Sequence, residues 1–384
     1  MRILHIISGL SIGGAEMMLY KLLSASDRNY FNPIVISLTD FGTLGENIKL
    51  LDIPVYKIDM SAGFLNLFKL WRFIKLIRKI KPDLIQGWMY HGNLAALLAK
   101  WFLPKSVFLS WNIRHTPDEL KKEKRLTRII ICLGAWLSLF PDGIIYNSKL
   151  SAQKHKKLGY SDKHVNIIPN GFDCEQFKPL NIARLRLLNL LKIEEGAFLI
   201  GMIARYHEMK DHDTMLFSAG EVVKIYPKVH FVLVGSDIDK KNQKLVKQID
   251  NLKLNKNVHL LGERRDVAEI TAGLDIACSS SSWGEGFSNA IGEAMACGVP
   301  CVVTDVGDSA RIVGETGIVV KSGDKKAFTD AIIRLIEMSF EERLQLGKLA
   351  RNRIIEHFSI DKVAKQYKDI YKIIYLRVLK NNRI

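Results

Sequence analysis

The sequence of 384 residues contains no run of about 18 uncharged apolar residues, the length that a helix needs to cross a bilayer. The longest apolar stretch, Ile129–Phe140, is shorter than that, and the apolar N-terminal stretch is too short for a secretory signal peptide. The five cysteines are odd in number and form no CxxC pair, so neither a disulfide framework nor a zinc site is indicated. We therefore expect a cytoplasmic protein of a reducing compartment.

Acidic residues are few relative to basic ones, with 40 Asp+Glu against 56 Lys+Arg and a formal net charge of +16. Such an excess suits an anionic partner, which can be nucleic acid, an anionic membrane surface or a phosphorylated substrate. A basic host proteome with a solvated surface is an alternative that the charge leaves open. No zinc, RRM or helix-turn-helix pattern is present, so we expect no nucleic-acid partner.

Short apolar runs rich in β-branched residues alternate with longer amphipathic runs, which predicts an α/β protein with parallel sheets covered on both faces. The predicted strands are Arg2–Ser8, Pro33–Leu38, Leu84–Gln86, Val107–Ser110, Gly143–Tyr146, Val165–Ile168, Phe198–Ile203, His230–Val234, Val258–Leu261, Ile276–Ser279, Pro300–Thr304 and Gly317–Val320. The predicted helices are Ala15–Ser26, Leu65–Ile80, Asn93–Trp101, Lys124–Ser138, Lys149–Leu158, Asp213–Ile225, Asn242–Asn251, Phe287–Cys297, Lys326–Met338 and Asp361–Leu379.

The alternation restarts near Phe198, which predicts two doubly wound Rossmann-like domains, residues 1–180 and 181–360, with a linker over Gly171–Glu195. In open α/β sheets, ligands bind at the carboxyl ends of the strands. We therefore expect the two domains to face a central cleft that holds the substrates.

A glycine-rich turn follows the first predicted strand and contains Gly13 and Gly14. Glycines let the backbone approach a ligand, and the start of the next helix favours phosphate. The motif is not GxGxxG, and no acidic residue obviously follows the second strand as a ribose ligand. A tight strand-to-helix turn without a ligand is therefore the alternative.

Two cations, Arg205 and Lys210, follow the first strand of the second domain. At that position they can neutralise a pyrophosphate and the charge that develops as it leaves. The alternative is a solvated basic loop.

The segment 279–300 carries the most information about function. After a strand and a loop of small residues, the backbone amides of Phe287, Ser288 and Asn289 are expected to form an anion site at a helix start. Glu293, further along the helix, can accept both hydroxyls of a ribose, and Glu285, before the helix, can face a sugar bonded to the phosphate. The alternative is that both carboxylates only complement the helix dipole.

Through these motifs, the sequence resembles the retaining glycosyltransferases of family 4, which have the GT-B fold, of the type that builds bacterial cell-surface polysaccharides. Glu285 and Glu293 fill the E-x7-E pattern within GEGFSNAIGEAMACGVPCVVTDVGD. The resemblance extends over nearly the whole chain through IPNGFD at 168–173, ARYHEMKDH at 204–212 and HLLGERRDV at 259–267.

The resemblance implies roles for individual residues. Arg205 and Lys210 are expected to hold the donor diphosphate and Glu293 the ribose, while Glu285 contacts the transferred sugar as a catalytic residue. The amides of Phe287, Ser288 and Asn289 are expected to receive phosphate or sugar hydroxyls. Gly262 and Arg264 are expected beside the base, and Gly13 and Gly14 to reach the donor from the facing domain. The last helix, within 361–384, is expected to cross back onto the first domain.

One departure concerns the histidine that many such enzymes carry near the sugar. Trp88 occupies the common position here, and His91 follows three residues later. His91 is expected as a catalytic residue, with Trp88 and His115 as sugar or acceptor contacts. A structural role is the alternative for each histidine.

The sequence predicts neither a metal site nor a cofactor. Two DxD patterns, Asp211-His212-Asp213 and Asp237-Ile238-Asp239, lie at a helix start and in a lysine-rich loop. We expect no metal requirement and front-face attack in which the leaving phosphate takes the acceptor proton, as the resemblance implies.

The segment 64–81 (FLNLFKLWRFIKLIRKIK) mixes aromatic and basic residues, and a second basic run over 121–125 precedes Ile129–Phe140. Such segments suit a peripheral contact with an anionic inner membrane surface. A helix that packs on the sheet with a basic outer face is the alternative.

The expected function is therefore hexosyl transfer from a UDP- or GDP-linked sugar to a glycan or lipid-linked saccharide. A nucleotide-sugar 2-epimerase of similar architecture is the alternative enzyme, and a basic nucleic-acid-binding protein is the alternative outside enzymes.

Overall fold

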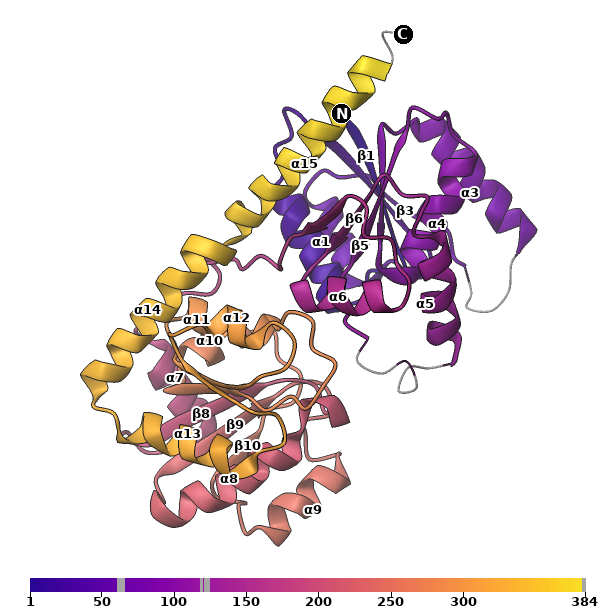
Figure 1. The fold of residues 1–384 in the computed structure, drawn as a ribbon. Coiled ribbons are helices and arrows are strands. Elements are labelled where there is room, and N and C mark those ends of the chain that lie inside the picture. The colour runs from indigo at the N-terminus through magenta and orange to yellow at the C-terminus, as the bar shows by residue number, and fades with distance from the viewer. Residues whose placement is uncertain (61–65, 118–119, 121–124, 382–384) are drawn as a thin grey trace. The chain divides into compact units, whose positions relative to one another are not determined.

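The structure is a computed structural model that describes residues 1–60, 66–117, 120 and 125–381. It divides into two compact units, Met1–Gly171 with Ile360–Ile384, and Phe172–Ser359 (Figure 1). Both units contain a parallel sheet with helices on its two faces, which confirms the predicted α/β class and the two Rossmann-like domains.

The first unit is built on a seven-stranded parallel sheet of order β3-β2-β1-β4-β5-β6-β7. This is the doubly wound order, which reverses between β1 and β4 and places a ligand crevice at the carboxyl ends of those strands. Its strands are β1 (Arg2–Ile7), β2 (Asn32–Ser37), β3 (Val55–Lys57), β4 (Leu84–Trp88), β5 (Phe108–Ile113), β6 (Gly143–Tyr146) and β7 (Val165–Ile167).

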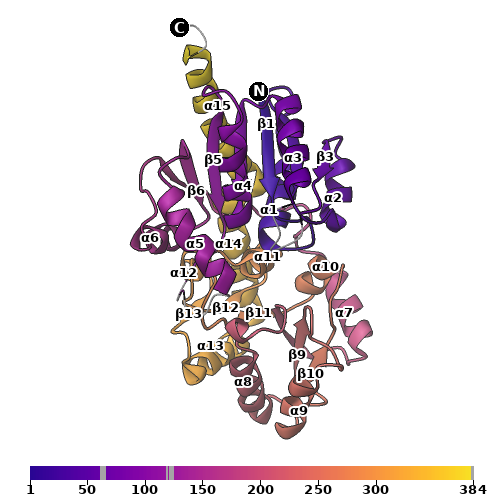
Figure 2. The same cartoon turned by 90° about the vertical axis from the view of Figure 1, so that its right-hand side faces the viewer.

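The helices of this unit form two layers. Helices α3 (Leu67–Ile80), α4 (Met89–Trp101) and α5 (Arg125–Leu137) cover one face of the sheet (Figure 2). Their apolar side chains pack on it. The opposite face is covered by α1 (Gly14–Ser24), α2 (Gly42–Lys49) and α15 (Ile360–Asn381). The remaining helix is α6 (Lys149–Lys157).

The C-terminal helix α15 belongs to the first unit although it follows the whole second unit in sequence. It buries Val363, Tyr367 and Tyr371 beside β1 and β4, on the apolar stripe that the sequence shows. The helix therefore completes the core of the first unit.

The second unit is built on a six-stranded parallel sheet of order β10-β9-β8-β11-β12-β13, which reverses between β8 and β11. Its strands are β8 (Phe198–Ile203), β9 (Val229–Val234), β10 (Val258–Leu260), β11 (Ile276–Ser279), β12 (Cys301–Thr304) and β13 (Ile318–Val320). One face is covered by α8 (His212–Ile225), α9 (Gln243–Asn251) and α13 (Lys325–Glu337). The other face is covered by α7 (Ala183–Leu191), α10 (Val267–Ala272), α11 (Asn289–Ala296), α12 (Ser309–Val313) and α14 (Phe340–Phe358).

The boundary between the units lies earlier than the sequence indicated. Phe172 is buried in the second unit, where its ring stacks on Phe287 with centroids 6.0 Å apart, and Phe177 joins the same core. Helix α7 lies inside the expected linker 171–195, because Leu187 and Leu188 bury an apolar face there.

Several elements were missing from the sequence interpretation, namely β3, α2, α10, α12 and the 19-residue helix α14. Helix α14 buries only four residues, two of which are Gly347 and Ala350, so its apolar stripe is weak. Its start was nevertheless marked by a capping box formed by Ser339 and Glu342. In the part of the chain that the structure describes, no helix has the length and apolar character of a membrane span.

Candidate functional site

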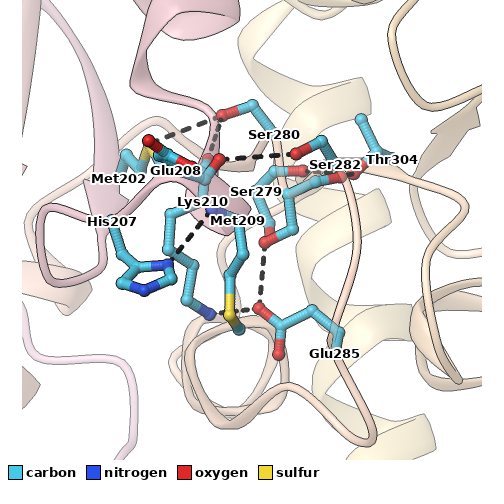
Figure 3. A network of polar contacts seen from close by, with 11 residues as sticks. Met202, His207, Glu208, Met209, Lys210, Ser279, Ser280, Ser282, Glu285 and Thr304 are labelled. Carbon is cyan, nitrogen blue, oxygen red and sulfur yellow. Dashed lines mark hydrogen bonds and ion pairs between the residues drawn. The ribbon is translucent and has the colours of Figure 1, made fainter. Parts of the chain in front are cut away.

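Two loops meet at the point where the strand order of the second unit reverses. The loop after β8 ends in the short 3-10 helix η2 (Glu208–Lys210), and the loop after β11 leads to α11. The amide of Ser282 donates to the carbonyl of Met209 at 2.9 Å. The hydroxyl of Ser280 lies 3.0 Å from the carbonyl of Lys210 and 2.9 Å from that of Asp211 (Figure 3). These bonds hold the two expected donor-binding loops together.

Lys210 reaches across this junction and forms an ion pair with Oε1 of Glu285 (Figure 3). The two side chains are 19% and 9% exposed, so the pair is largely shielded from water. The next residue, Asp211, has a φ of 49° and caps α8 by accepting from the amide of Thr214 at 3.1 Å. The backbone that carries Lys210 is therefore fixed on both sides.

Glu285 is held by more than its ion pair. The hydroxyl of Ser281 donates to Oε1 of Glu285 at 2.9 Å, and the carbonyl of Ser281 accepts from Oγ1 of Thr304 at 2.5 Å. The backbone beside Glu285 passes close to Gly307, where an added Cβ would lie 2.4 Å from the carbonyl oxygen of Glu285. Only glycine fits at that position.

Arg205 lies on the same loop as Lys210 and is exposed. Across the described residues it has no hydrogen bond or ion pair to another side chain. Its guanidinium is therefore available to an anion at the carboxyl end of β8.

Helix α11 begins at Asn289 with Ser288 as its N-cap, two residues later than predicted. The Ser288 side chain makes no capping bond. The ring of Phe287 packs in the core, with its centroid 5.5 Å from that of Phe358. The amides at the helix start are consequently those of Asn289 and the residues after it, so the expected anion site is shifted by about half a turn.

Glu293 lies one turn into α11 and is half-buried. Its neighbour Gly292 faces Phe172 so closely that an added Cβ would be 2.0 Å from the ring. This close contact fixes how α11 sits on the core and therefore where Glu293 projects from.

Gly262 and Arg264, which the resemblance predicts beside the base, follow β10. Gly262 adopts a φ of 66°, and its amide donates to the carbonyl of Ile238 at 2.8 Å. Arg264 makes a bidentate pair with Asp266, at 2.8 Å and 2.6 Å. The hydrogen bonds to Asp266 raise the pKa of Arg264. The sequence did not reveal this partner, whose two hydrogen bonds fix the position of the Arg264 guanidinium.

The glycine-rich turn of the first unit lies at the carboxyl end of β1. Gly13 is the N-cap of α1 and Gly14 is its first residue. An added Cβ on Gly13 would lie 2.3 Å from a carboxylate oxygen of Glu16. Burial raises the pKa of Glu16, and the negative charge of the nearby Asp40 raises it further.

Asp40 follows the second strand, where the sequence showed no obvious ribose ligand. Asp40 accepts from the amide of Leu10 at 3.0 Å and from the hydroxyl of Ser11 at 3.1 Å. Partial burial acts against ionisation of Asp40, but these bonds and one from Thr39 lower its pKa overall. Asp40 thus holds the glycine-rich turn in place.

Trp88 lies in the core of the first unit and is 0% exposed. The predicted contact of Trp88 with a sugar or acceptor is therefore wrong. Its Nε1 donates to Nδ1 of His5 at 3.1 Å, and its ring stacks on Tyr367 of α15. The tryptophan fills the space beneath the returning C-terminal helix, a packing partner that local sequence does not reveal.

His91 lies at the start of α4, just after β4, and His115 lies in the loop that follows β5. His91 is exposed in the first turn of α4, and desolvation lowers its pKa. Just before it, Met89 has a φ of 61°, a strained conformation for a side chain of this size that often occurs at functional sites. His115 makes an edge contact with Tyr90, with centroids 6.0 Å apart.

The two DxD segments serve local structure. Asp211 caps α8, and Asp213 accepts from Nε2 of Gln248 at 2.8 Å. Asp239 accepts from the amide of Lys241 at 2.8 Å. Within residues 1–60, 66–117, 120 and 125–381, no group of three or more His, Cys, Asp or Glu side chains is arranged to hold a metal ion.

Comparison with known proteins identifies both halves of the chain. Residues 12–176 match the model for "Glycosyltransferase Family 4", and residues 197–338 match that for "Glycosyl transferases group 1". The UDP-Gal:alpha-D-GlcNAc-diphosphoundecaprenol alpha-1,3-galactosyltransferase of Escherichia coli is 29% identical, over 87% of this chain and 86% of that protein. A Campylobacter jejuni enzyme, N,N'-diacetylbacillosaminyl-diphospho-undecaprenol alpha-1,3-N-acetylgalactosaminyltransferase, is 25% identical over 88% of this chain and 89% of its own.

Solved structures share the fold. Anabaena Alr3699/HepE, in complex with UDP and glucose, superposes with a TM-score of 0.82 at 22% identity, over 97% of this chain and 99% of that one. A glycosyltransferase from Rickettsia africae superposes with a TM-score of 0.79 at 18% identity, over 97% and 98% of the two chains. With a family 4 model on its first unit, a group 1 model on its second and the fold of these structures, the chain belongs to the GT-B glycosyltransferases of family 4.

Proposed function

We propose that this glycosyltransferase moves a hexosyl unit, with retention of configuration, from a UDP- or GDP-linked sugar to a lipid-linked saccharide or related glycan. The observation that carries the proposal is the junction of the two loops at the switch point of the second sheet. It places Lys210 and Glu285 in contact and puts Arg205 on the same loop as Lys210. Cations for a diphosphate and a carboxylate for a sugar thus occupy adjacent positions.

The roles follow from charge and placement. Arg205 and Lys210 bind the diphosphate, and their charge stabilises it as it leaves. The start of α11, with its unbonded N-cap side chain at Ser288, adds amide donors for phosphate or sugar hydroxyls. Glu293 on the same helix accepts the ribose hydroxyls, and Gly262 with Arg264 lies beside the base.

The chemistry we favour is front-face attack. The acceptor hydroxyl forms the new bond to the anomeric carbon on the face from which the nucleoside diphosphate departs. The leaving phosphate oxygen takes the acceptor proton, so no carboxylate has to act as a nucleophile. Glu285 contacts the transferred sugar and stabilises the positive charge that develops on it. His91 contacts the sugar from the first unit, with His115 as a further contact.

The test is a binding and turnover screen with full-length protein. Thermal shift and calorimetry would be run with UDP-glucose, UDP-galactose, the two N-acetylhexosamine forms and GDP-mannose. The proposal requires saturable binding of at least one of these and release of its nucleoside diphosphate. Tight RNA binding without nucleotide-sugar binding, or 2-epimerisation of the sugar, would contradict the proposal.

We further propose that no metal is needed, because Arg205 and Lys210 supply the positive charge that a metal would otherwise provide at the diphosphate. Turnover in excess EDTA, compared with turnover in added magnesium or manganese, tests this directly. Loss of activity in EDTA that either metal restores would contradict it.

The proposed acceptor is a lipid-linked saccharide at the inner face of the plasma membrane, with the enzyme in the cytoplasm as a peripheral protein. The names of the relatives from Escherichia coli and Campylobacter jejuni specify diphosphoundecaprenol-linked sugars, which supports this acceptor class. Residues 64 and 65 of the predicted membrane-contacting segment 64–81, and residues 121–124 of the basic run 121–125, lie outside the described residues.

Two helices of the first unit supply a surface for this contact. Helix α3 exposes Leu67, Phe68 and Trp71, and Lys75 lies 5.1 Å from the Trp71 ring. Helix α5 packs on the same face of the sheet (Figure 2). It exposes an apolar stripe that includes Trp136. Exposed aromatics beside lysines suit the interface of an anionic leaflet.

A further inference from the structure

Lys210 and Glu285 are partners of each other, although the proposed function assigns them to different parts of the donor. Nζ of Lys210 contacts Oε1 of Glu285 (Figure 3). The hydroxyl of Ser281 donates to the same oxygen at 2.9 Å. Since both charged side chains are mostly buried, each depends on the other for compensation of its charge. A ligand that binds the Lys210 ammonium therefore removes the cation that compensates the charge of Glu285.

The carboxylate of Glu285 is held in place by its hydrogen bond and by its backbone, so it cannot easily move to another partner. Ser281 is 1% exposed and holds Oε1, and its own carbonyl is tied to Thr304. The backbone of Glu285 is fixed against Gly307. When a diphosphate draws Lys210 away, Glu285 retains only the Ser281 hydroxyl, and a buried carboxylate without a cation is costly.

We propose that the Lys210–Glu285 pair makes the enzyme select the intact nucleotide sugar over the nucleoside diphosphate. This inference rests on the proposed function. A nucleotide sugar brings hydroxyl groups that donate to Glu285 as the diphosphate engages Lys210. A nucleoside diphosphate engages Lys210 but brings no such donors, so Glu285 competes with it for the cation.

The same contact gives the pair a role in turnover. After the sugar is transferred, the leaving diphosphate remains next to a carboxylate that has lost its hydroxyl donors. Glu285 then regains Lys210, which weakens the hold on the product. The pair thus discriminates between substrate and product through the sugar hydroxyls, which the product lacks.

The experiment compares the wild type with Glu285→Gln, which keeps the side-chain shape and removes the charge. Calorimetry would measure the Kd of UDP and of UDP-galactose, or of GDP and GDP-mannose if the screen selects guanine donors. We expect Glu285→Gln to bind the nucleoside diphosphate about three- to tenfold more tightly and the nucleotide sugar no more tightly. Equal shifts for both ligands, or weaker binding of the diphosphate, would overturn the inference.

A matched control removes an exposed carboxylate from the same loop. Glu208→Gln changes the local charge by the same amount, two residues before Lys210. It should shift the Kd values of both ligands by one common, small factor. If Glu208→Gln reproduced the selective gain for the diphosphate, the effect would be general charge repulsion and the inference would fail.

A second pair of variants, made in protein that already carries Lys210→Met, tests whether the effect depends on competition for Lys210. In Lys210→Met, the ammonium is gone, so Glu285→Gln should tighten diphosphate binding much less than it does in the wild type. An undiminished gain would overturn the inference. Absence of binding of any nucleotide or nucleotide sugar to the wild type would instead contradict the proposed function itself, so the two failures are distinct.

Discussion

The phenol oxygen of Tyr367, on the C-terminal helix, accepts a hydrogen bond from Nδ2 of Asn112 at 2.8 Å, across 255 residues of sequence. NH2 of Arg114 donates to the same oxygen. Helix α15 is therefore attached to the first sheet by buried polar contacts as well as by its apolar stripe, and it belongs to the structural core of the first unit (Figure 1).

Replacing Tyr367 with Phe removes the acceptor of one buried donor, Nδ2 of Asn112, and of one half-buried donor, NH2 of Arg114. Because a buried donor left without a partner costs its full desolvation, we expect a loss of about 1–3 kcal/mol in the free energy of unfolding. Urea denaturation followed by tryptophan fluorescence measures it. Tyr30→Phe is the matched control, since Tyr30 is 60% exposed, and it should unfold as the wild type does. Equal stability of Tyr367→Phe and the control would refute the argument.

Arg205→Gln tests the diphosphate site. Loss of a charge-assisted hydrogen bond costs about 1.5–3 kcal/mol, so the Kd of UDP or GDP should rise roughly ten- to hundredfold. Arg265→Gln removes another exposed guanidinium of the second unit, which makes no hydrogen bond or ion pair with its side chain among the described residues. If both variants weakened binding equally, the effect would come from net charge and Arg205 would have no direct role.

Glu293→Gln tests the ribose contact. A carboxylate that accepts both ribose hydroxyls is sensitive to the 2′-hydroxyl, so the wild type should bind 2′-deoxy-UDP about tenfold more weakly than UDP. In Glu293→Gln that difference should shrink, while the affinity for UDP itself falls. Calorimetry with the two nucleotides provides the comparison. A 2′-deoxy penalty that is unchanged in the variant would remove the ribose role from Glu293.

The sequence predicted most strands within one or two residues because each is a short apolar run, and it placed the E-x7-E segment correctly at the start of a helix. It did not reveal that Lys210 and Glu285 form a pair, since these residues are 75 positions apart and only the parallel order of β8 and β11 brings them together. Trp88 was misjudged for the same reason. Its partner Tyr367 comes from a helix that follows an entire second unit.

Acid should destabilise the protein, because several histidines are buried in neutral form. Burial lowers the pKa of His155 to about 4. Its Nδ1 donates to the carbonyl of Ser151 at 2.8 Å, so Nε2 accepts from the hydroxyl of Tyr90 at 2.9 Å, and protonation of Nε2 would force that bond to reverse. Since the unfolded chain binds this proton near pH 6.5, the stabilisation is complete above that pH and declines as the pH falls toward about 4.

Each such histidine adds up to about 1.4 kcal/mol per pH unit to the slope of unfolding free energy in this window. His155→Gln should therefore show a shallower slope between pH 7 and pH 5 in urea denaturation. His357→Gln, at an exposed position, should keep the wild-type slope. A slope for His155→Gln as steep as that of the wild type would show that His155 takes up no proton on unfolding in this range.

The exposed face of α3 predicts binding to anionic membranes. Phe68 and Trp71 are 68% and 56% exposed, and their rings stack with centroids 5.9 Å apart. Burying large side chains of this kind contributes about 1.5–3 kcal/mol each. Replacing both with Ser should therefore reduce co-sedimentation with vesicles of phosphatidylglycerol and phosphatidylcholine at least tenfold, while turnover with a water-soluble acceptor is retained.

The lysines and arginines of α3 make the same binding depend on charge. Raising the salt concentration or leaving out phosphatidylglycerol should weaken wild-type binding, because both reduce the attraction of the basic residues to the leaflet. Phe340→Ser is the matched control, since Phe340 is 64% exposed but lies on the second unit. Equal loss of binding in this control, or wild-type binding that is indifferent to phosphatidylglycerol, would show that α3 does not form the membrane contact.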